Sequence, residues 1–329
     1  MTYTILLIIL GLIMIIAGAH FLVEGSSRIA TRFGISDIVI GMTVVAIGTS
    51  APELVVSFLG AVKGSVGLAV GNILGSNICN ILLIIGLSAI IYPMTVTRAN
   101  VNRDMQFMLL STLALLVISL DAQIETLTID DQMTGNVISR SEGILLLLFF
   151  CIFMGYSIAS AKRSEDQDAE QTEDGKPVVK KNVLVSLLMF AGGLAVLIWG
   201  GNILVDNATT LARAKGVSDT LIGATIVAVG TSLPELATSV MAACRKKVGL
   251  AIGNVIGSNI FNVLLILGGC AAVTPLPLGN VNHVHYIFLL LATLLFLVSA
   301  RTSFKIRRIE GVMLFALYIL YIIVSISLA

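Results

Sequence analysis

The stretch Gly41-Met-Thr-Val-Val-Ala-Ile-Gly-Thr-Ser-Ala-Pro-Glu53 occurs a second time in this chain, as Gly223-Ala-Thr-Ile-Val-Ala-Val-Gly-Thr-Ser-Leu-Pro-Glu235. The two copies are 182 residues apart. Extended to 34–82 and 216–264, the same offset gives 28 identities in 49 positions without a gap. An internal match of this length indicates that the chain contains two copies of one structural unit.

A second motif follows at the same offset. Gly71-Asn-Ile-Leu-Gly-Ser-Asn-Ile-Cys-Asn80 corresponds to Gly253-Asn-Val-Ile-Gly-Ser-Asn-Ile-Phe-Asn262. Duplication retained for packing alone predicts apolar identities, yet many identical positions in both motifs are Gly, Thr, Ser, Pro, Glu and Asn. We therefore expect the repeated unit to carry chemistry as well as structure.

Long apolar runs surround both motifs. Hydrophobic residues make up 57% of the chain, charged residues 12%, and the mean hydropathy is +1.01. Soluble domains carry about 25% charged residues, and a helix needs about 20 apolar residues to span a bilayer. The sequence predicts an all-α polytopic membrane protein with ten spans, at 3–23, 36–60, 66–92, 104–121, 142–161, 182–204, 218–244, 248–273, 284–300 and 308–328.

The basic residues predict the orientation. If the N-terminus lies outside and the chain crosses ten times, sixteen Lys and Arg residues fall inside and four outside, in agreement with the positive-inside rule. Both termini are then outside. The polar segment 162–181 is expected to be a disordered cytoplasmic linker, because its composition cannot bury a core.

The linker divides the chain into two five-helix repeats, 1–161 and 182–329, with their motifs at 41–80 and 223–262. Five is an odd number, so the second repeat enters the membrane from the opposite side. Inverted repeats of this kind are typical of secondary transporters, whose binding sites lie near the midplane where broken helices meet.

Two acidic residues stand out against this topology. Of the 19 carboxylates, only Glu53 and Glu235 lie deep inside a predicted span. A charge at the bilayer centre costs about 2.5–3.5 kcal/mol on insertion scales, and two like charges on symmetry-related helices also repel each other. A cation bound between them would relieve both costs.

The residues around these glutamates favour a cation that prefers oxygen. Pro52 and Pro234 have no N–H group, so the carbonyls of Gly48 and Gly230 lose their helical donors. Calcium takes 6–8 oxygens in flexible geometry, and sodium uses the same hard ligands. The motifs contain no imidazole and a single thiol, Cys79, which Phe261 replaces in the second copy, and this argues against zinc or copper. Hydroxyl and amide candidates share helix faces in both repeats: Thr49, Ser50, Ser76 and Asn80, with Thr231, Ser232, Ser258 and Asn262.

For other polar residues of the repeat we expect structural roles. We expect Asn77 and Asn259 to form interhelical hydrogen bonds where glycines permit close packing. The matched pair Glu24 and Asp206 lies near span ends and is interpreted as caps or gates.

The two motifs resemble the alpha-repeats of the cation/calcium exchanger superfamily, in particular its YrbG-like bacterial inner-membrane sodium/calcium exchangers. The resemblance covers the whole chain and implies a ten-helix fold, a diamond-shaped central site and alternating access by sliding of the first and sixth helices. It also implies that Glu53 and Glu235 hold calcium, while Ser and Thr oxygens and the main-chain carbonyls of Ala46 and Ala228 serve flanking sodium sites. Many members carry Asp where this chain has Asn262, a difference that bears on stoichiometry and on the driving ion.

These observations predict a transporter, not an enzyme: an antiporter that exchanges calcium for sodium without a cofactor. The expected partners are the two ions and the lipid bilayer, with no nucleic acid and no obligate protein partner. A proton-coupled antiporter of calcium or another cation is the main alternative. A channel, and an intramembrane hydrolase that uses the two glutamates as an acid–base dyad, are the other classes.

Overall fold

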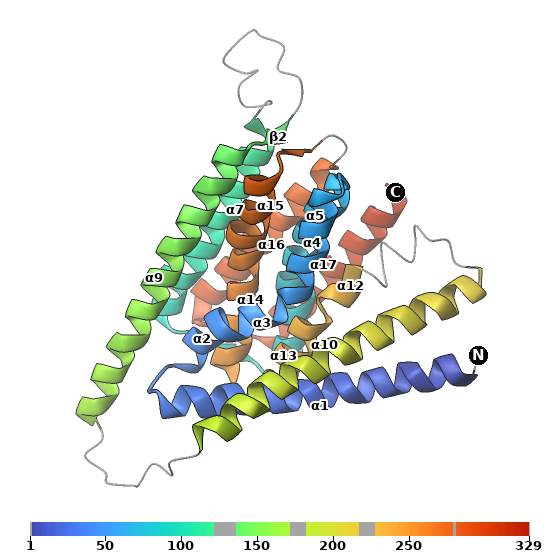
Figure 1. The fold of residues 1–329 in the computed structure, drawn as a ribbon. Coiled ribbons are helices and arrows are strands. Elements are labelled where there is room, and N and C mark those ends of the chain that lie inside the picture. Colours follow the sequence, from blue (N-terminus) through green and yellow to red (C-terminus); the bar gives the residue numbers. More distant parts are fainter. Residues whose placement is uncertain (1, 122–135, 172–181, 217–227, 279–280, 329) are drawn as a thin grey trace.

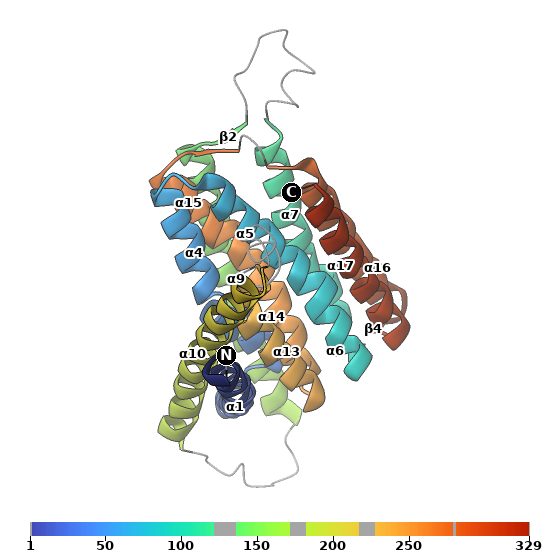
Figure 2. The ribbon, with the colours of Figure 1, turned by 90° about the vertical axis from the view of Figure 1, so that its right-hand side faces the viewer.

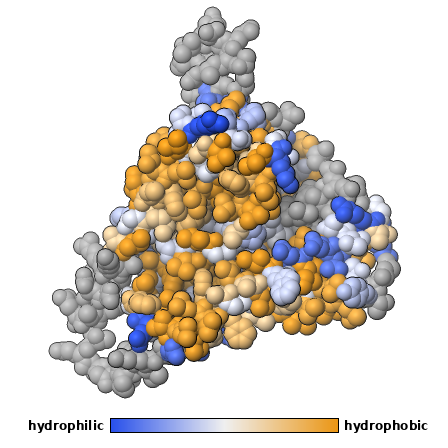
Figure 3. Space-filling model, viewed as in Figure 1, coloured by the Kyte–Doolittle hydropathy of each residue, from blue (hydrophilic) through white to orange (hydrophobic). Residues whose placement is uncertain are grey.

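The computed structural model describes residues 2–121, 136–171, 182–216, 228–278 and 281–328. In these residues eight helical segments are long and apolar enough to cross a membrane, and one bent pair of helices gives a ninth. Hydrophobic side chains cover much of the visible face of the helical bundle (Figure 3). The predicted polytopic helical membrane fold is confirmed.

The first half contains five helical units. A long helix comes first and a broken helix second, and the second, third and fourth units each contain a π-helical segment, labelled η. The bounds are α1 (Thr2–Arg32); α2 (Asp37–Ile40), η1 (Gly41–Val45), α3 (Ala46–Thr49) and α4 (Ala51–Val62); α5 (Val66–Ile78), η2 (Cys79–Ile85) and α6 (Gly86–Ile91); η3 (Asn100–Asp104) and α7 (Met105–Ser119); and α9 (Arg140–Gln171).

The second half follows the same order where it is described. Its bounds are α10 (Val183–Ala214); α12 (Ala228–Thr231) and α13 (Leu233–Cys244); α14 (Val248–Ile260), η5 (Phe261–Leu267) and α15 (Gly268–Val273); α16 (His283–Ser303); and α17 (Arg308–Ser327). The predicted span 218–244 lies partly at 217–227, outside the described residues. The count of ten spans therefore stays a prediction.

The disorder predicted for the segment 162–181 was wrong over its first part, while its role as a linker stays a prediction. Helix α9 runs on through the start of 162–181 and ends at Gln171, and residues 172–181 lie outside the description. The continuation contains neither Gly nor Pro and includes Ala, Lys, Arg, Glu and Gln, which are good helix formers. A polar segment that extends an existing helix needs neither a new nucleus nor a buried core.

Helices α1 and α10 lie side by side and cross the direction of the remaining helices (Figures 1 and 2). Glycines bring their backbones together: a Cβ added at Gly193 would lie 2.5 Å from the Leu22 nitrogen, and one at Gly11 would lie 2.9 Å from the Gly200 oxygen. At the offset of 182, Gly11 corresponds to Gly193, and Gly18 to Gly200. The contact is therefore nearly two-fold symmetric, as expected when two inverted copies meet face to face.

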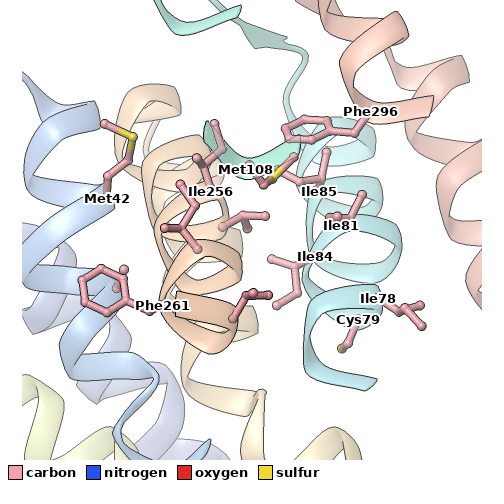
Figure 4. Packing of buried hydrophobic residues seen from close by; sticks show 14 of the residues in the cluster. Met42, Ile78, Cys79, Ile81, Ile84, Ile85, Met108, Ile256, Phe261 and Phe296 are labelled. Atoms are coloured by element: carbon pink, nitrogen blue, oxygen red, sulfur yellow. The ribbon is translucent and has the colours of Figure 1, made fainter. Parts of the chain in front are cut away.

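The third and eighth helical units form the centre of the bundle. Their most apolar windows are 83% and 94% buried, against 17–39% for the other long segments. Figure 4 shows Ile84 of η2 directed toward α14, whose Ile256 belongs to the same buried hydrophobic cluster. These two units carry the second motif, so its polar residues sit in the best-packed part of the protein.

Two short ribbons connect the halves. Strand β1 (Met94–Thr95) pairs with β4 (Lys305–Ile306), and β2 (Val137–Ile138) pairs with β3 (Leu276–Pro277), both antiparallel. In each ribbon one strand comes from each half of the chain, so the ribbons join the two halves at their edges.

Candidate ion-binding site

The break in the second helical unit positions the first carboxylate. Helices α3 and α4 meet at Ser50 with a bend of 48°, and Pro52 occupies the first turn of α4, where a missing N–H does no harm. Glu53 lies in the same turn, close to the positive end of the helix dipole, and is 1% exposed. Glu235, in the first turn of α13 after Pro234, is also 1% exposed.

Each carboxylate is bound by a serine of the opposite repeat. The Ser50 hydroxyl donates to Glu235 Oε1 at 2.8 Å, and the Ser232 hydroxyl donates to Glu53 Oε1 at 3.1 Å. These serines are the residues at which the helices break. The two broken helices therefore hold each other's glutamate.

The central helices add a second serine to each side. Ser258 Oγ lies 3.0 Å from Ser50 Oγ and 3.4 Å from Glu235 Oε1. Ser76 Oγ lies 3.2 Å from Ser232 Oγ and 3.5 Å from Glu53 Oε1. The structure thus brings six of the predicted residues into two matching clusters: Glu53, Ser76 and Ser232 in one, Glu235, Ser50 and Ser258 in the other.

The two threonines occupy a neighbouring position. Thr49 Oγ1 donates to Asn254 Oδ1 at 3.1 Å, and Thr231 Oγ1 donates to Asn72 Oδ1 at 3.2 Å. These asparagines stand at the start of the second motif and were not predicted as site residues. Each also donates to a serine of its own repeat, Asn254 to Ser239 and Asn72 to Ser57, both at 3.0 Å.

Sequence reasoning could have found this layer. Asn72 and Asn254, and likewise Ser57 and Ser239, are identical at the offset of 182 residues. They are polar positions retained in both copies, like the glutamates, and differ only in lying farther from the helix breaks.

The asparagines at the end of the second motif are buried, with 1% exposure for both Asn80 and Asn262. Asn262 Nδ2 donates to Asn77 Oδ1 at 2.9 Å, and Asn77 Nδ2 donates to the Asn259 carbonyl at 3.4 Å. The interhelical hydrogen bonding predicted for Asn77 is therefore confirmed. The Asn259 side chain instead donates to the Val255 carbonyl of its own helix at 2.8 Å, and only the Asn259 main-chain carbonyl takes part in the bond between helices.

The structure says little about the two main-chain carbonyls, of Ala46 and Ala228, that were predicted as sodium ligands. The Ala46 carbonyl accepts the Ser50 N–H at 2.9 Å and lies 3.4 Å from Thr49 Oγ1, and a carbonyl has a second lone pair. Ala228 is the first residue of α12. Their role as ligands stays a prediction.

Four buried oxygens of the site have no hydrogen-bond partner in the described part of the chain. They are two symmetric pairs: Oε2 of Glu53 and Glu235, and Oδ1 of Asn80 and Asn262. Within the same residues neither carboxylate forms an ion pair. Buried polar groups are normally satisfied and buried charges paired, so this arrangement calls for a bound cation.

A cavity of about 370 Å³ opens beside the site. It lies between α4 and α10 and extends to α12 and α13. Pro52, Thr231 and Pro234 line it, so it ends next to both helix breaks.

The comparisons with known proteins agree with this geometry. The chain matches the family described as "Sodium/calcium exchanger protein" over residues 3–159 and 185–327. It belongs to this sodium/calcium exchanger family. The prediction of a transporter of the cation/calcium exchanger type is confirmed.

Relatives of this exchanger family match along nearly their full length. The inner membrane protein YrbG of Escherichia coli is 34% identical over 330 residues, covering 96% of this chain and 94% of its own. The sodium/calcium exchanger MaX1 of Methanosarcina acetivorans is 32% identical, covering 98% of both chains.

Solved structures of the sodium-calcium exchanger NCX_Mj share the fold of this family member. One soaked with sodium and no calcium has a TM-score of 0.81 at 35% identity, and one soaked with sodium and calcium has 0.80 at 35%. Both alignments cover 97% of each chain.

Proposed function

We propose that this protein exchanges calcium for sodium across the cytoplasmic membrane by alternating access. The observation that carries the proposal is the set of four unpaired, buried oxygens on Glu53, Glu235, Asn80 and Asn262. The sodium and calcium with which NCX_Mj was soaked, and the name of MaX1, support the choice of ions.

The ligand set fits calcium in number and charge. Two carboxylates supply the formal charge of −2 that one calcium ion neutralises. Carboxylate, amide and hydroxyl oxygens together reach the 6–8 ligands that calcium prefers. The proposed ligands are the residues predicted from the sequence, with the Ala46 and Ala228 carbonyls serving sodium.

The hydrogen bonds of the two serines suggest how the ions would compete. Each of Ser50 and Ser232 donates its only hydroxyl proton to a glutamate. A hydroxyl can rotate and offer a lone pair to a cation once the glutamate oxygen binds that cation instead. Sodium and calcium would thus draw on overlapping oxygens, and occupation by one would disfavour the other.

The same proposal includes the orientation. The excess of basic residues on one side supports an orientation with both termini in the periplasm and the segment 162–181 in the cytoplasm. No protein partner is needed, because both repeats that build the site belong to one chain.

The test is flux in proteoliposomes. Calcium uptake should follow an imposed sodium gradient, reverse when the gradient is reversed, and stop when sodium is replaced by choline. Uptake driven by a pH gradient but not by sodium would identify a proton-coupled antiporter. Uptake that continues without any counter-ion would identify a channel.

A further inference from the structure

The two halves differ in how the crossing helices meet the broken helices. Helix α1 contacts α13, and Ala19 and Val23 of α1 are 0% and 1% exposed. The equivalent residues of α10, Gly201 and Val205, line the cavity of about 370 Å³ that separates α10 from α4. Among the described residues, one side of the site is therefore closed by helix packing, and the other borders an open cavity.

An ion pair holds the closed side. Arg245, directly after α13, places Nη1 2.9 Å from Glu24 Oε2 of α1. Its Nη2 lies 2.6 Å from His20 Nδ1, and Arg28 Nε binds Glu24 Oε1 at 2.8 Å. The ion pair between Glu24 and Arg245 joins the first repeat to the second, at the end of the contact between α1 and α13.

The repeat supplies an equivalent pair on the open side. At the offset of 182, Glu24 corresponds to Asp206 and Arg245 to Lys63, so the sign of each charge is kept. Asp206 lines the cavity, and Lys63 directly follows α4 as Arg245 follows α13. Within the described residues, Asp206 and Lys63 do not form an ion pair with each other.

We propose that these four residues form two alternating gates: Glu24–Arg245 closes one entrance in the state seen here, and Asp206–Lys63 closes the other entrance in the opposite state. The inference rests on the proposed exchange function, which requires both states. Because α1 and α10 are packed backbone to backbone through glycines, they would move together. Motion that separates α1 from α13 would then close α10 on α4.

The side chains of Arg245 and Glu24 are 27% and 31% exposed. Pairs with this exposure contribute modestly, so each gate should change the populations of the two states about two- to fivefold. Breaking one gate should raise the population of one state, and breaking the other gate should lower it. A purely structural role of these residues does not require such opposite effects.

A cysteine at Ala19 reports on the opposite state, because this residue is buried in the state seen here. The Ala19→Cys reporter is placed in a protein whose exposed Cys151 and Cys244 are replaced by Ser, and its rate of modification by a water-soluble maleimide is measured in nanodiscs. Val23→Cys is the second reporter if the first variant does not fold.

Glu24→Gln and Arg245→Gln should each raise the labelling rate about two- to fivefold, and their double variant should not exceed either single variant. Asp206→Asn and Lys63→Gln should each lower the rate by a similar factor. Arg32→Gln, which removes a charge from the same end of α1, should leave the rate unchanged.

The proposal would be overturned if variants of both ion pairs changed the labelling rate in the same direction, or if neither pair of variants changed it. Labelling needs no ion gradient, so it separates the gate from the exchange function. Opposite shifts in a protein that fails the sodium-gradient test would retain the gates and reject the proposed ions.

Discussion

The broken helices α3–α4 and α12–α13 have nearly the same sequence and sit in different surroundings. Both bury a glutamate at 1% exposure and both receive a serine from the other copy. Yet Pro234 is buried in α13, whereas Pro52 is partly exposed and both border the open cavity. The side chains of the candidate site thus follow the repeated sequence, while access to them depends on how other helices pack around the two breaks.

The largest expected effect tests the symmetric part of this comparison. Glu53→Gln and Glu235→Gln should each reduce sodium-driven calcium uptake about 100-fold or more, because breaking a buried charge interaction costs about 3–5 kcal/mol. Proteoliposome flux measures the loss, and Glu142→Gln at the start of α9 is the control with nearly unchanged flux. If only one of the two glutamates matters, the carboxylates are not equivalent ligands.

The second prediction concerns the symmetric contact of α1 with α10. Gly193→Ala forces a Cβ against Leu22 and should lower the free energy of unfolding by about 1–3 kcal/mol. Its neighbour offers a matched control, since a Cβ at Gly192 has no atom within 4 Å among the described residues. Thermal unfolding in detergent should show the loss for Gly193→Ala and for its equivalent Gly11→Ala, but not for Gly192→Ala. Equal stability of all three variants would contradict the close contact.

A third pair of variants tests where the two copies diverge. Asn254 is 0% exposed, and Asn72 is partly exposed. Asn254→Ala removes the acceptor that lies 3.1 Å from Thr49 Oγ1 and the donor to Ser239 Oγ, both in a buried setting, which should cost about 1–3 kcal/mol. Water can replace the bonds lost in Asn72→Ala, so the cost there should be smaller. Unfolding midpoints of the two variants give the order, and a larger loss for Asn72→Ala would show that the second copy is not the better packed.

The smallest effect concerns the two asparagines that end the second motif. Asn262 donates to Asn77, whereas Asn259 Oδ1, the equivalent acceptor in the other copy, has no hydrogen-bond partner in the described residues. Without ions, Asn262→Asp should therefore be less stable than Asn80→Asp by about 1 kcal/mol, the value of one lost hydrogen bond. Calorimetry with and without calcium measures this difference. If Asn80→Asp is the less stable variant, the difference in hydrogen bonding between Asn77 and Asn259 does not stabilise the protein as described.

Much of the candidate site was predictable from the sequence. The glutamates, the helix-breaking prolines and the Ser76/Ser258 pair were identified because polar groups in lipid are costly and because each occurs twice. Asn72 and Asn254 were missed, since their importance comes from bonds to Thr231 and Thr49 that form only when the repeats pack together. The helical start of 162–181 was missed for another reason: composition was used to infer disorder where local helix propensity decides.

The sequence by itself determined the membrane class, the two repeats and the residue types offered to a cation, because each of these depends on local polarity or on the repeat. Only the tertiary structure decided that each glutamate is held by a serine of the opposite repeat, and that one entrance is closed while the other is open. Two nearly identical motifs occupy these two environments in one molecule. Their difference therefore arises from the packing of α1 and α10 against the broken helices, a property of contacts distant in sequence.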